Sequence, residues 1–247
     1  MINITELAKI KEDRRTNLYY EEKEYLQYIF LYAISKYAID FVFKGGTCLR
    51  ICYGLERASE DLDFNTPLNL TELKKIIHVC LKKFDLLNIS YKIYSEREYE
   101  GNFRVEIRFN GPLFVDKSTS TNTWKLDFNR KKVNNTISKV IPQLFSDVPL
   151  FILIILDEKE IFAEKIRALV SRSEARDLYD VWILLNKKVE IDKKLILEKL
   201  KEENKRLSDL KLPSKEEYTN NLKQLVSFVP SYEQVKKEVL ELIKKIK

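Results

Sequence analysis

The chain has 247 residues, of which 45% are hydrophobic, 11% aromatic and 33% charged. This length and apolar content predict a globular protein with the core of one large domain or two modest ones, and they exclude a disordered chain. The formal net charge is +6, and the longest apolar run, 148–156, is far shorter than the roughly twenty residues that cross a bilayer, so we expect no membrane span.

The basic excess lies mainly in the C-terminal quarter of the chain. Residues 187–247 hold 16 Lys and Arg against 11 Asp and Glu, a net charge of +5 out of the total of +6. Such a region suits a polyanionic partner such as RNA, although Lys- and Glu-rich helices that are merely solvated have the same composition.

The three cysteines predict a reducing compartment. Cys48, Cys52 and Cys80 form neither a C-x-x-C pair nor an even disulfide set. We interpret them as reduced core residues and expect a soluble, cytoplasmic protein.

Helices and strands alternate in the predicted N-terminal part. Apolar residues at helical spacing predict helices over 21–38 and 71–87, and a compact helix over 47–53 that ends at Gly54. A turn at Gly101–Asn102 would close a hairpin. Short apolar runs and period-two alternation predict the strands, at 41–43, 62–64, 89–94, 103–109, 123–128 and 151–156.

The pattern changes after residue 157. Only helices are predicted there, at 161–170, 175–185, 193–205, 215–228 and 233–246. We therefore predict an α+β fold, with a mixed β-sheet flanked by helices in residues 1–157 and a C-terminal helical region in residues 158–247.

Two carboxylates stand one residue apart in the predicted strand at 62–64. Residues i and i+2 of a strand project from the same face, so Asp61 and Asp63 would point one way while Leu62 packs into the core. Two such acids repel each other unless a cation lies between them, and Mg²⁺ binds through one or two carboxylates plus substrate phosphates. The alternative is a pair of solvated acids at the end of a strand.

A glycine pair precedes these acids. Gly45, Gly46 and Thr47 lie between an apolar strand and a short helix, where backbone without side chains lets a phosphate approach the N–H groups of a helix N-terminus. The helix and its return loop bring the chain back to the D-x-D strand. The two elements can therefore face one triphosphate and its metal.

Two blocks of the sequence resemble a known family. KGGTCLRICYGLERASEDLDF (44–64) and AEKIRALVSRSEARDLYDVW (163–182) are similar to the two signature blocks of the AbiEii/AbiGii toxin nucleotidyltransferases, relatives of the MenT toxins in the DNA polymerase β-like nucleotidyltransferase superfamily. The resemblance implies that residues 1–157 form the nucleotidyltransferase domain and that residues 158–247 complete the active site.

Residue by residue, the resemblance implies a phosphate loop and a metal site. Gly45, Gly46 and Thr47 would form the loop, with Thr47 supplying any hydroxyl contact because many superfamily members have Gly-Ser where this chain has Gly-Gly. Asp61 and Asp63 would bind catalytic Mg²⁺, or Mn²⁺ in its place. The nucleotide-binding set implied around them also includes Lys44, which adds charge near the phosphates, and Arg57 and Ser59 of the R-x-S-x-D-L-D segment, with Arg57 supporting the carboxylates.

A third carboxylate is common in the superfamily on a later strand. Asp127 of WKLDF is the best candidate, since alternation aligns it with Lys125 and puts Leu126 and Phe128 on the other face. An ordinary exposed strand acid would show the same pattern.

The second block adds a lysine and an acid. By resemblance, Lys165 would neutralise the departing pyrophosphate and Asp177 would fix that lysine or orient the acceptor. A structural salt bridge between two helices is the other interpretation of this pair.

The implied reaction is nucleotidyl transfer from an NTP to an acceptor hydroxyl. The resemblance suggests the tRNA 3′ end as acceptor and a toxin with a cognate antitoxin. Two alternatives stay open: a protein acceptor that becomes nucleotidylylated, and a non-catalytic nucleotide- or RNA-binding module of the same fold. The paired carboxylates disfavour the non-catalytic module, because a protein that only binds nucleotide or RNA has no evident need for them.

Overall fold

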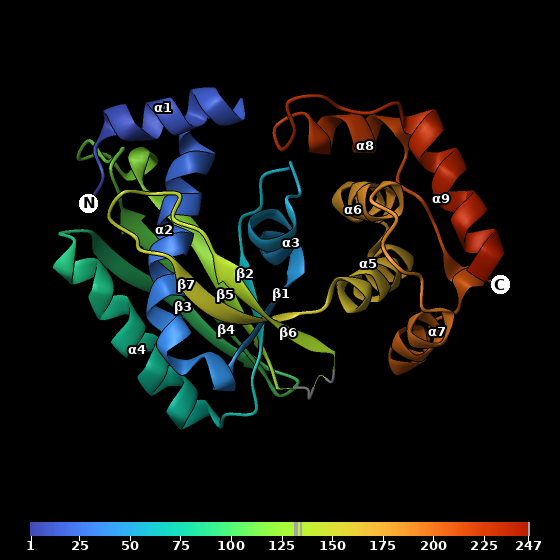
Figure 1. Cartoon of the computed structure of the whole chain (residues 1–247), viewed down its shortest axis with the longest axis horizontal. Coiled ribbons are helices and arrows are strands. Elements are labelled where there is room, and N and C mark those ends of the chain that lie inside the picture. The colour runs from blue at the N-terminus through green and yellow to red at the C-terminus, as the bar shows by residue number, and fades with distance from the viewer. Residues whose placement is uncertain (131–132, 134, 247) are drawn as a thin grey trace. The chain divides into compact units, whose positions relative to one another are not determined.

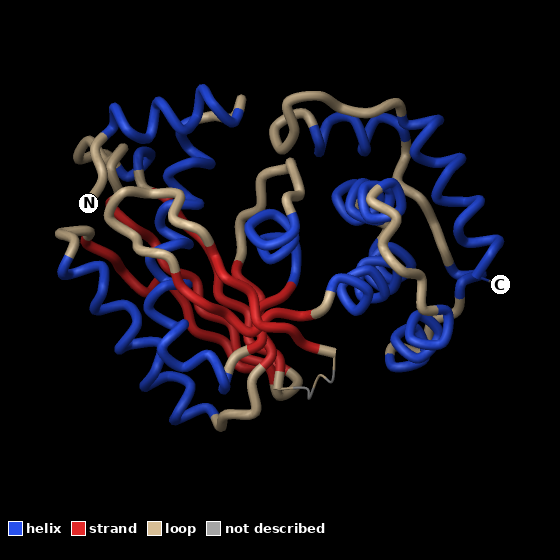
Figure 2. The backbone as a smooth tube through the Cα atoms, in the orientation of Figure 1, coloured by secondary structure: helices blue, strands red, loops and turns tan. Residues whose placement is uncertain are grey.

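One mixed sheet forms the centre of the N-terminal part of the computed structural model, which describes residues 1–130, 133 and 135–246 (Figures 1 and 2). Within those residues the sheet has seven strands in the order β3-β4-β5-β2-β1-β7-β6. The parallel pairs are β1 with β7 and β2 with β5, and the other neighbours are antiparallel. The strands are β1 (Val42–Lys44), β2 (Leu62–Asn65), β3 (Ser90–Tyr99), β4 (Asn102–Asn110), β5 (Asn122–Asn129), β6 (Thr136–Ile141) and β7 (Phe151–Leu156). This architecture confirms the predicted α+β fold.

The described residues divide into two compact units, made of Met1–Gly54 with Ala58–Leu156, and of Leu55–Arg57 with Asp157–Lys247. The second unit is helical. Its helices are α5 (Glu158–Arg172), α6 (Ala175–Asn186), α7 (Lys193–Glu202), α8 (Lys215–Leu222) and α9 (Tyr232–Ile246). No helix in the described part of the chain is long and apolar enough to cross a membrane.

Helices α2 (Leu18–Ile34) and α4 (Leu70–Leu86) pack on the same face of the sheet (Figure 1). Phe30 of α2 lies 5.6 Å from Trp124 of β5 between ring centroids, and Phe84 of α4 lies 4.7 Å from Phe109 of β4. Apolar residues on alternate positions of β4 and β5 are buried against these helices, whereas the residues between them lie on the opposite face. The first unit also contains α1 (Ile4–Arg14) and α3 (Gly45–Tyr53).

Turn chemistry explains several element ends. Gly54 takes the left-handed conformation and ends α3 as predicted, with φ of 67°. The β3–β4 hairpin turns one residue earlier than predicted, because Glu100 and Gly101 both have positive φ, as a two-residue type I′ turn requires. One α-helix and one strand were not predicted: α1 buries only Leu7, and β6 is largely exposed, so neither has a clear apolar pattern.

Candidate active site

Gly45 lies against the carboxylate of Asp63. Strand β1 pairs antiparallel with β2 so that Lys44 is opposite Asp63, and helix α3 begins at the next residue, Gly45. A Cβ atom added to Gly45 would lie 2.2 Å from Oδ2 of Asp63, and the φ of Gly45 is +78°. Both facts require glycine here, because other residues rarely adopt this φ and a methyl group would displace the carboxylate.

Replacing Gly45 with alanine should therefore be costlier than an unfavourable φ alone. The matched control is Gly101→Ala, since Gly101 has a φ of +76° but nothing within 4 Å of the added Cβ. We expect Gly101→Ala to destabilise the protein by about 1 kcal/mol and Gly45→Ala by a further ~1–3 kcal/mol for overpacking. Urea denaturation of both variants measures this difference, and equal losses of stability would show that Asp63 moves aside freely.

Asp61, Asp63 and Asp127 lie on the face of the sheet opposite α2 and α4. Asp63 of β2 and Asp127 of β5 are register partners in a parallel pair, so their side chains project together. Asp61 stands two residues before Asp63 and accepts a hydrogen bond from the backbone N–H of Lys125 at 3.2 Å. Burial raises the pKa of Asp61, the charge of Lys125 opposes that shift, and the nearby carboxylate of Asp127 adds to it.

Asp127 is bound by two residues that are not among the predicted site residues. Oδ1 of Asp127 accepts hydrogen bonds from Nε of Arg104 at 2.7 Å and from the hydroxyl of Tyr99 at 3.1 Å. Arg104 is its cross-strand partner on β4, and the side chain of Asp127 is largely buried. A guanidinium in this place offsets the charge that three neighbouring carboxylates would otherwise concentrate.

These acids suit a hard divalent cation. Among the described residues no three Asp, Glu, His or Cys side chains are gathered closely enough to hold an ion by themselves. Mg²⁺ commonly binds through one or two carboxylates and completes its shell with water and substrate phosphates. Asp61 and Asp63 therefore fit a Mg²⁺ that arrives with a phosphate ligand, and the role of Asp127 as third ligand stays a prediction.

Thr47 joins the glycine loop to the carboxylate strand. Its side chain is fully buried, its hydroxyl donates to the backbone carbonyl of Asp61 at 2.5 Å, and Oγ of Ser59 lies 2.9 Å away. Gln27 of α2 donates to the carbonyl oxygens of Ser59 and Glu60 at 3.3 and 2.8 Å. The hydroxyl of Thr47 thus holds the loop 59–61 in place. Lys44, 7% exposed, ends β1 opposite Asp63.

Lys165 and Asp177 form an ion pair inside the second unit. The Nζ atom of Lys165 on α5 lies 3.3 Å from Oδ1 of Asp177 on α6 and 2.7 Å from Oδ2 of Asp180. Both aspartates are fully buried. Asp180 is not among the predicted site residues, although its position three residues after Asp177 puts it on the same helix face.

Arg57 binds Asp180 through two parallel hydrogen bonds. Its Nε and Nη2 donate to the two carboxylate oxygens at 2.6 and 2.7 Å, and the guanidinium is buried. Asp177 is bound in the same way by Arg172, at 2.6 and 3.0 Å. The support of Arg57 for Asp61 and Asp63 stays a prediction.

The electrostatics of this cluster favour ionised acids. Burial alone would raise the pKa of Asp180, but the charges of Arg57 and Lys165 outweigh it and lower the pKa. Burial likewise opposes ionisation of Asp177, whose pKa is lowered by Lys165 and Arg172. The cluster is therefore a network of ionised side chains, and removing one partner is expected to lower the stability of the fold.

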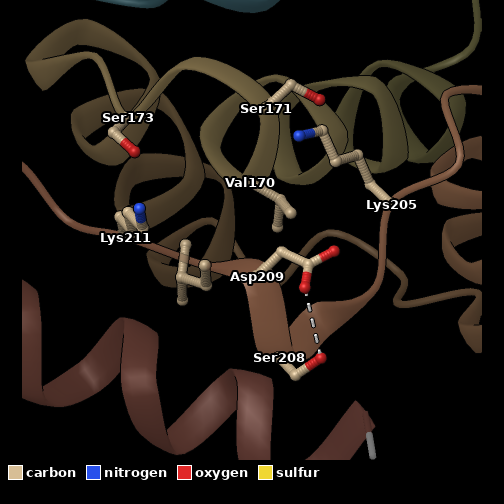
Figure 3. Close-up of a pocket in the computed structure, with 8 residues that line it drawn as sticks. Val170, Ser171, Ser173, Lys205, Ser208, Asp209 and Lys211 are labelled. Carbon is tan, nitrogen blue, oxygen red and sulfur yellow. Dashed lines mark hydrogen bonds between the residues drawn. The ribbon is translucent and has the colours of Figure 1, made fainter.

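A polar pocket of 480 Å³ lies in the basic C-terminal region (Figure 3). Lys205 and Lys211 lie in its wall with one acid, Asp209. Oδ1 of Asp209 faces the hydroxyl of Ser208, and Oδ2 accepts a hydrogen bond from the backbone N–H of Arg206. The remaining lining residues are Val170, Ser171, Ser173, Ser208 and Leu210. The predicted RNA contact of this region is thus compatible with its side chains and stays a prediction.

Comparisons with known proteins give a family and a fold. A family model described as "Nucleotidyl transferase AbiEii toxin, Type IV TA system" matches residues 29–241. Among curated proteins, no sequence matches the chain.

Two solved structures share the fold. MenT4, a nucleotidyltransferase toxin from Mycobacterium tuberculosis, is 20% identical, with a TM-score of 0.72 over 97% of this chain and 89% of MenT4. JHP933 from Helicobacter pylori is 21% identical, with a TM-score of 0.61 over 94% of this chain and 93% of JHP933. The likeness extends over both compact units.

Proposed function

The chain belongs to the AbiEii family of nucleotidyltransferase toxins of type IV toxin–antitoxin systems, and we propose that it transfers a nucleoside monophosphate from an NTP to the 3′ end of tRNA. The observation that carries this proposal is the placement of Asp63 between its register partner Asp127 and the glycine that begins α3. Carboxylates bind the metal of a metal-bound triphosphate, and the N–H groups of a helix that begins with glycine bind its phosphates.

We assign Asp61 and Asp63 as ligands of the catalytic metal, with Asp127 as the candidate for a third ligand. The ion is Mg²⁺, or Mn²⁺ in its place. When bound, the metal would lower the pKa of the attacking hydroxyl and neutralise charge on the leaving phosphates. The acceptor hydroxyl attacks the α-phosphate, pyrophosphate leaves, and Asp63 or Asp127 accepts the proton. Gly45 and Gly46 let the phosphates approach the backbone at the start of α3.

The second unit contributes two candidates for the same reaction. Lys165 is our candidate for neutralising the leaving pyrophosphate, and Asp177 is our candidate for fixing that lysine or orienting the acceptor. Because both belong to a buried charge network, loss of transfer in their variants supports a catalytic role only where the variant stays folded. The tRNA acceptor is supported by the basic C-terminal quarter, and a cognate antitoxin by the family.

Label transfer tests the proposal directly. The protein is incubated with Mg²⁺, each labelled NTP in turn and total tRNA, and we expect label on RNA that disappears with EDTA or with Asp61→Ala. Absence of transfer by the wild type, or equal transfer by Asp61→Ala, would contradict the enzymatic proposal. Label on protein would identify the alternative acceptor.

Calorimetry separates the enzyme from a non-catalytic module. We expect nucleotide binding to strengthen with Mg²⁺, because the paired carboxylates repel an uncompensated triphosphate. Binding that is indifferent to Mg²⁺ would favour the module.

A further inference from the structure

Cationic side chains gather on one face of strands β3, β4 and β5. The register places Lys92 beside Arg108 and Arg97 beside Arg104, and Lys125 follows on β5, on the face opposite α2 and α4. We call this the basic face, made of Lys92, Arg97, Arg104, Arg108 and Lys125.

The acids of these three strands divide equally between the two faces of the sheet. Glu96 and Glu98 of β3 are register partners of Val105 and Phe103, whose side chains are buried on the helix side, and Glu96 pairs with Lys74 of α4 at 2.6 Å. Glu106 and Asp127 are the acids that the strand register puts on the basic face. With five cations against two acids, the part of this face that β3, β4 and β5 form carries a net positive charge, which favours an anionic ligand.

Two tyrosine rings add a second kind of contact. Tyr94 is 60% exposed and Tyr99 39% exposed. The guanidinium carbon of Arg108 lies 4.8 Å from the centroid of the Tyr94 ring, and that of Arg104 lies 5.5 Å from Tyr99. The register of β3 shifts at Tyr94, between Ile93 and Ser95, and such bulges re-aim a side chain.

Arg108 has one buried donor nitrogen that no hydrogen bond among the described residues satisfies. This nitrogen is Nε of the guanidinium. A buried polar group without a partner is costly, and a small rotation of the Arg108 side chain on binding would bring this N–H to an acceptor oxygen of a ligand.

The basic face is continuous with the carboxylates. Tyr99 and Arg104 both donate to Asp127, so a strand lying across β3 and β4 ends at the candidate metal site. We propose that the basic face binds the acceptor as a single strand of RNA, with phosphates on Lys92, Arg97 and Arg108 and an unpaired base stacked on Tyr94. The identification of this strand as the acceptor rests on the proposed function.

The exposed Tyr94 ring favours a single-stranded nucleic acid over a duplex or an acidic polypeptide, and the choice of RNA rests on the proposed function. Exposed rings stack on unpaired bases, which a duplex keeps inside its helix. An acidic polypeptide would meet the same cations but has no base to place on the Tyr94 ring.

Binding of a fluorescent single-stranded RNA, followed by anisotropy over a range of salt concentrations, tests this inference on the full chain without NTP. We expect Arg97→Ala with Arg108→Ala to weaken binding at least tenfold and to reduce the slope of log K against log salt by about 1.4, since each phosphate contact on a single strand contributes about 0.7. Tyr94→Ala should weaken binding about tenfold with little change in slope, and Tyr94→Phe should keep it.

The matched control is Lys75→Ala with Lys82→Ala, which removes the same charge from exposed positions on α4. This control should bind as the wild type does. Equal binding by all variants, or tighter binding of polyglutamate than of RNA, would overturn the inference.

Failure of the proposed function gives a different result. Asp61→Ala should bind the RNA normally although it transfers no label. If the wild type transfers nothing while the Arg97, Arg108 and Tyr94 variants lose binding, RNA binding by the basic face is supported and the proposed reaction is contradicted. If transfer occurs and every variant binds RNA equally, only the assignment of RNA binding to the basic face is contradicted.

Discussion

Asparagine in place of Asp63 is expected to slow nucleotidyl transfer by a factor on the order of a thousand without unfolding the protein. Asp63 lies between the start of α3 and Asp127, where it can hold a metal and accept a proton. Asparagine has the same shape but cannot supply the charge. Transfer to RNA is measured with labelled NTP at saturating Mg²⁺.

Thermal denaturation separates this effect from misfolding. In the wild type, Mg²⁺ with a non-hydrolysable NTP should raise Tm, because a ligand that binds only the folded state stabilises it. In Asp63→Asn the rise should be absent, whereas the metal-free variant should still unfold in one cooperative transition, since asparagine keeps the shape of the side chain.

Asp85→Asn is the control, because Asp85 is an exposed acid on α4. It should match the wild type in both measurements. A metal-free Tm that falls steeply in Asp63→Asn would assign Asp63 to the fold instead, and unchanged transfer would remove it from the reaction.

The strand that carries Asp61 and Asp63 could be predicted because local patterns determine it. Leu62 and Phe64 are buried in β2 as alternation requires, and 151–156 forms β7 with the predicted bounds. Gly54 likewise ends α3 through its own conformational freedom. Each of these features depends on a few adjacent residues.

Strand pairing could not be predicted from the same patterns. Asp63 and Asp127 meet because β2 and β5 pair in parallel with one particular register, and Arg104 reaches Asp127 because β4 pairs with β5. A shift of two residues would preserve every alternation and separate these groups. The partners of Asp127 therefore cannot be predicted, although residues 103–109 are predicted as a strand.

The charge cluster of the second unit shows the same limit. Lys165 and Asp177 were paired through the family resemblance, but Asp180 binds both Lys165 and Arg57. The i, i+3 spacing of Asp177 and Asp180 in the helix was the available signal. Nothing local could indicate Arg57, more than a hundred residues before its partner.

Asparagine in place of Asp180 is expected to lower the free energy of unfolding by about 3–5 kcal/mol. Arg57 is 3% exposed and donates twice to Asp180, and Lys165 lies 2.7 Å from it. Removing the carboxylate would leave these buried cations with too little negative charge. Urea denaturation followed by circular dichroism measures the loss.

Glu190→Gln is the matched control, since Glu190 has a 75% exposed side chain 4.0 Å from Lys159. An exposed pair of this kind contributes about 0–1 kcal/mol, so a similar loss in both variants would contradict the buried network as a source of stability.

The pH dependence gives a second test of the Asp180 network. The pKa of Asp180 is lowered in the folded protein, so its contribution is complete above the ordinary pKa of about 3.9 and is lost as pH falls below it. The difference in stability between wild type and Asp180→Asn should therefore be constant from pH 7 to 5 and should shrink below about pH 4. A difference that grows on acidification would mean that Asp180 is protonated in the folded state, and the network would then depend on Asp177.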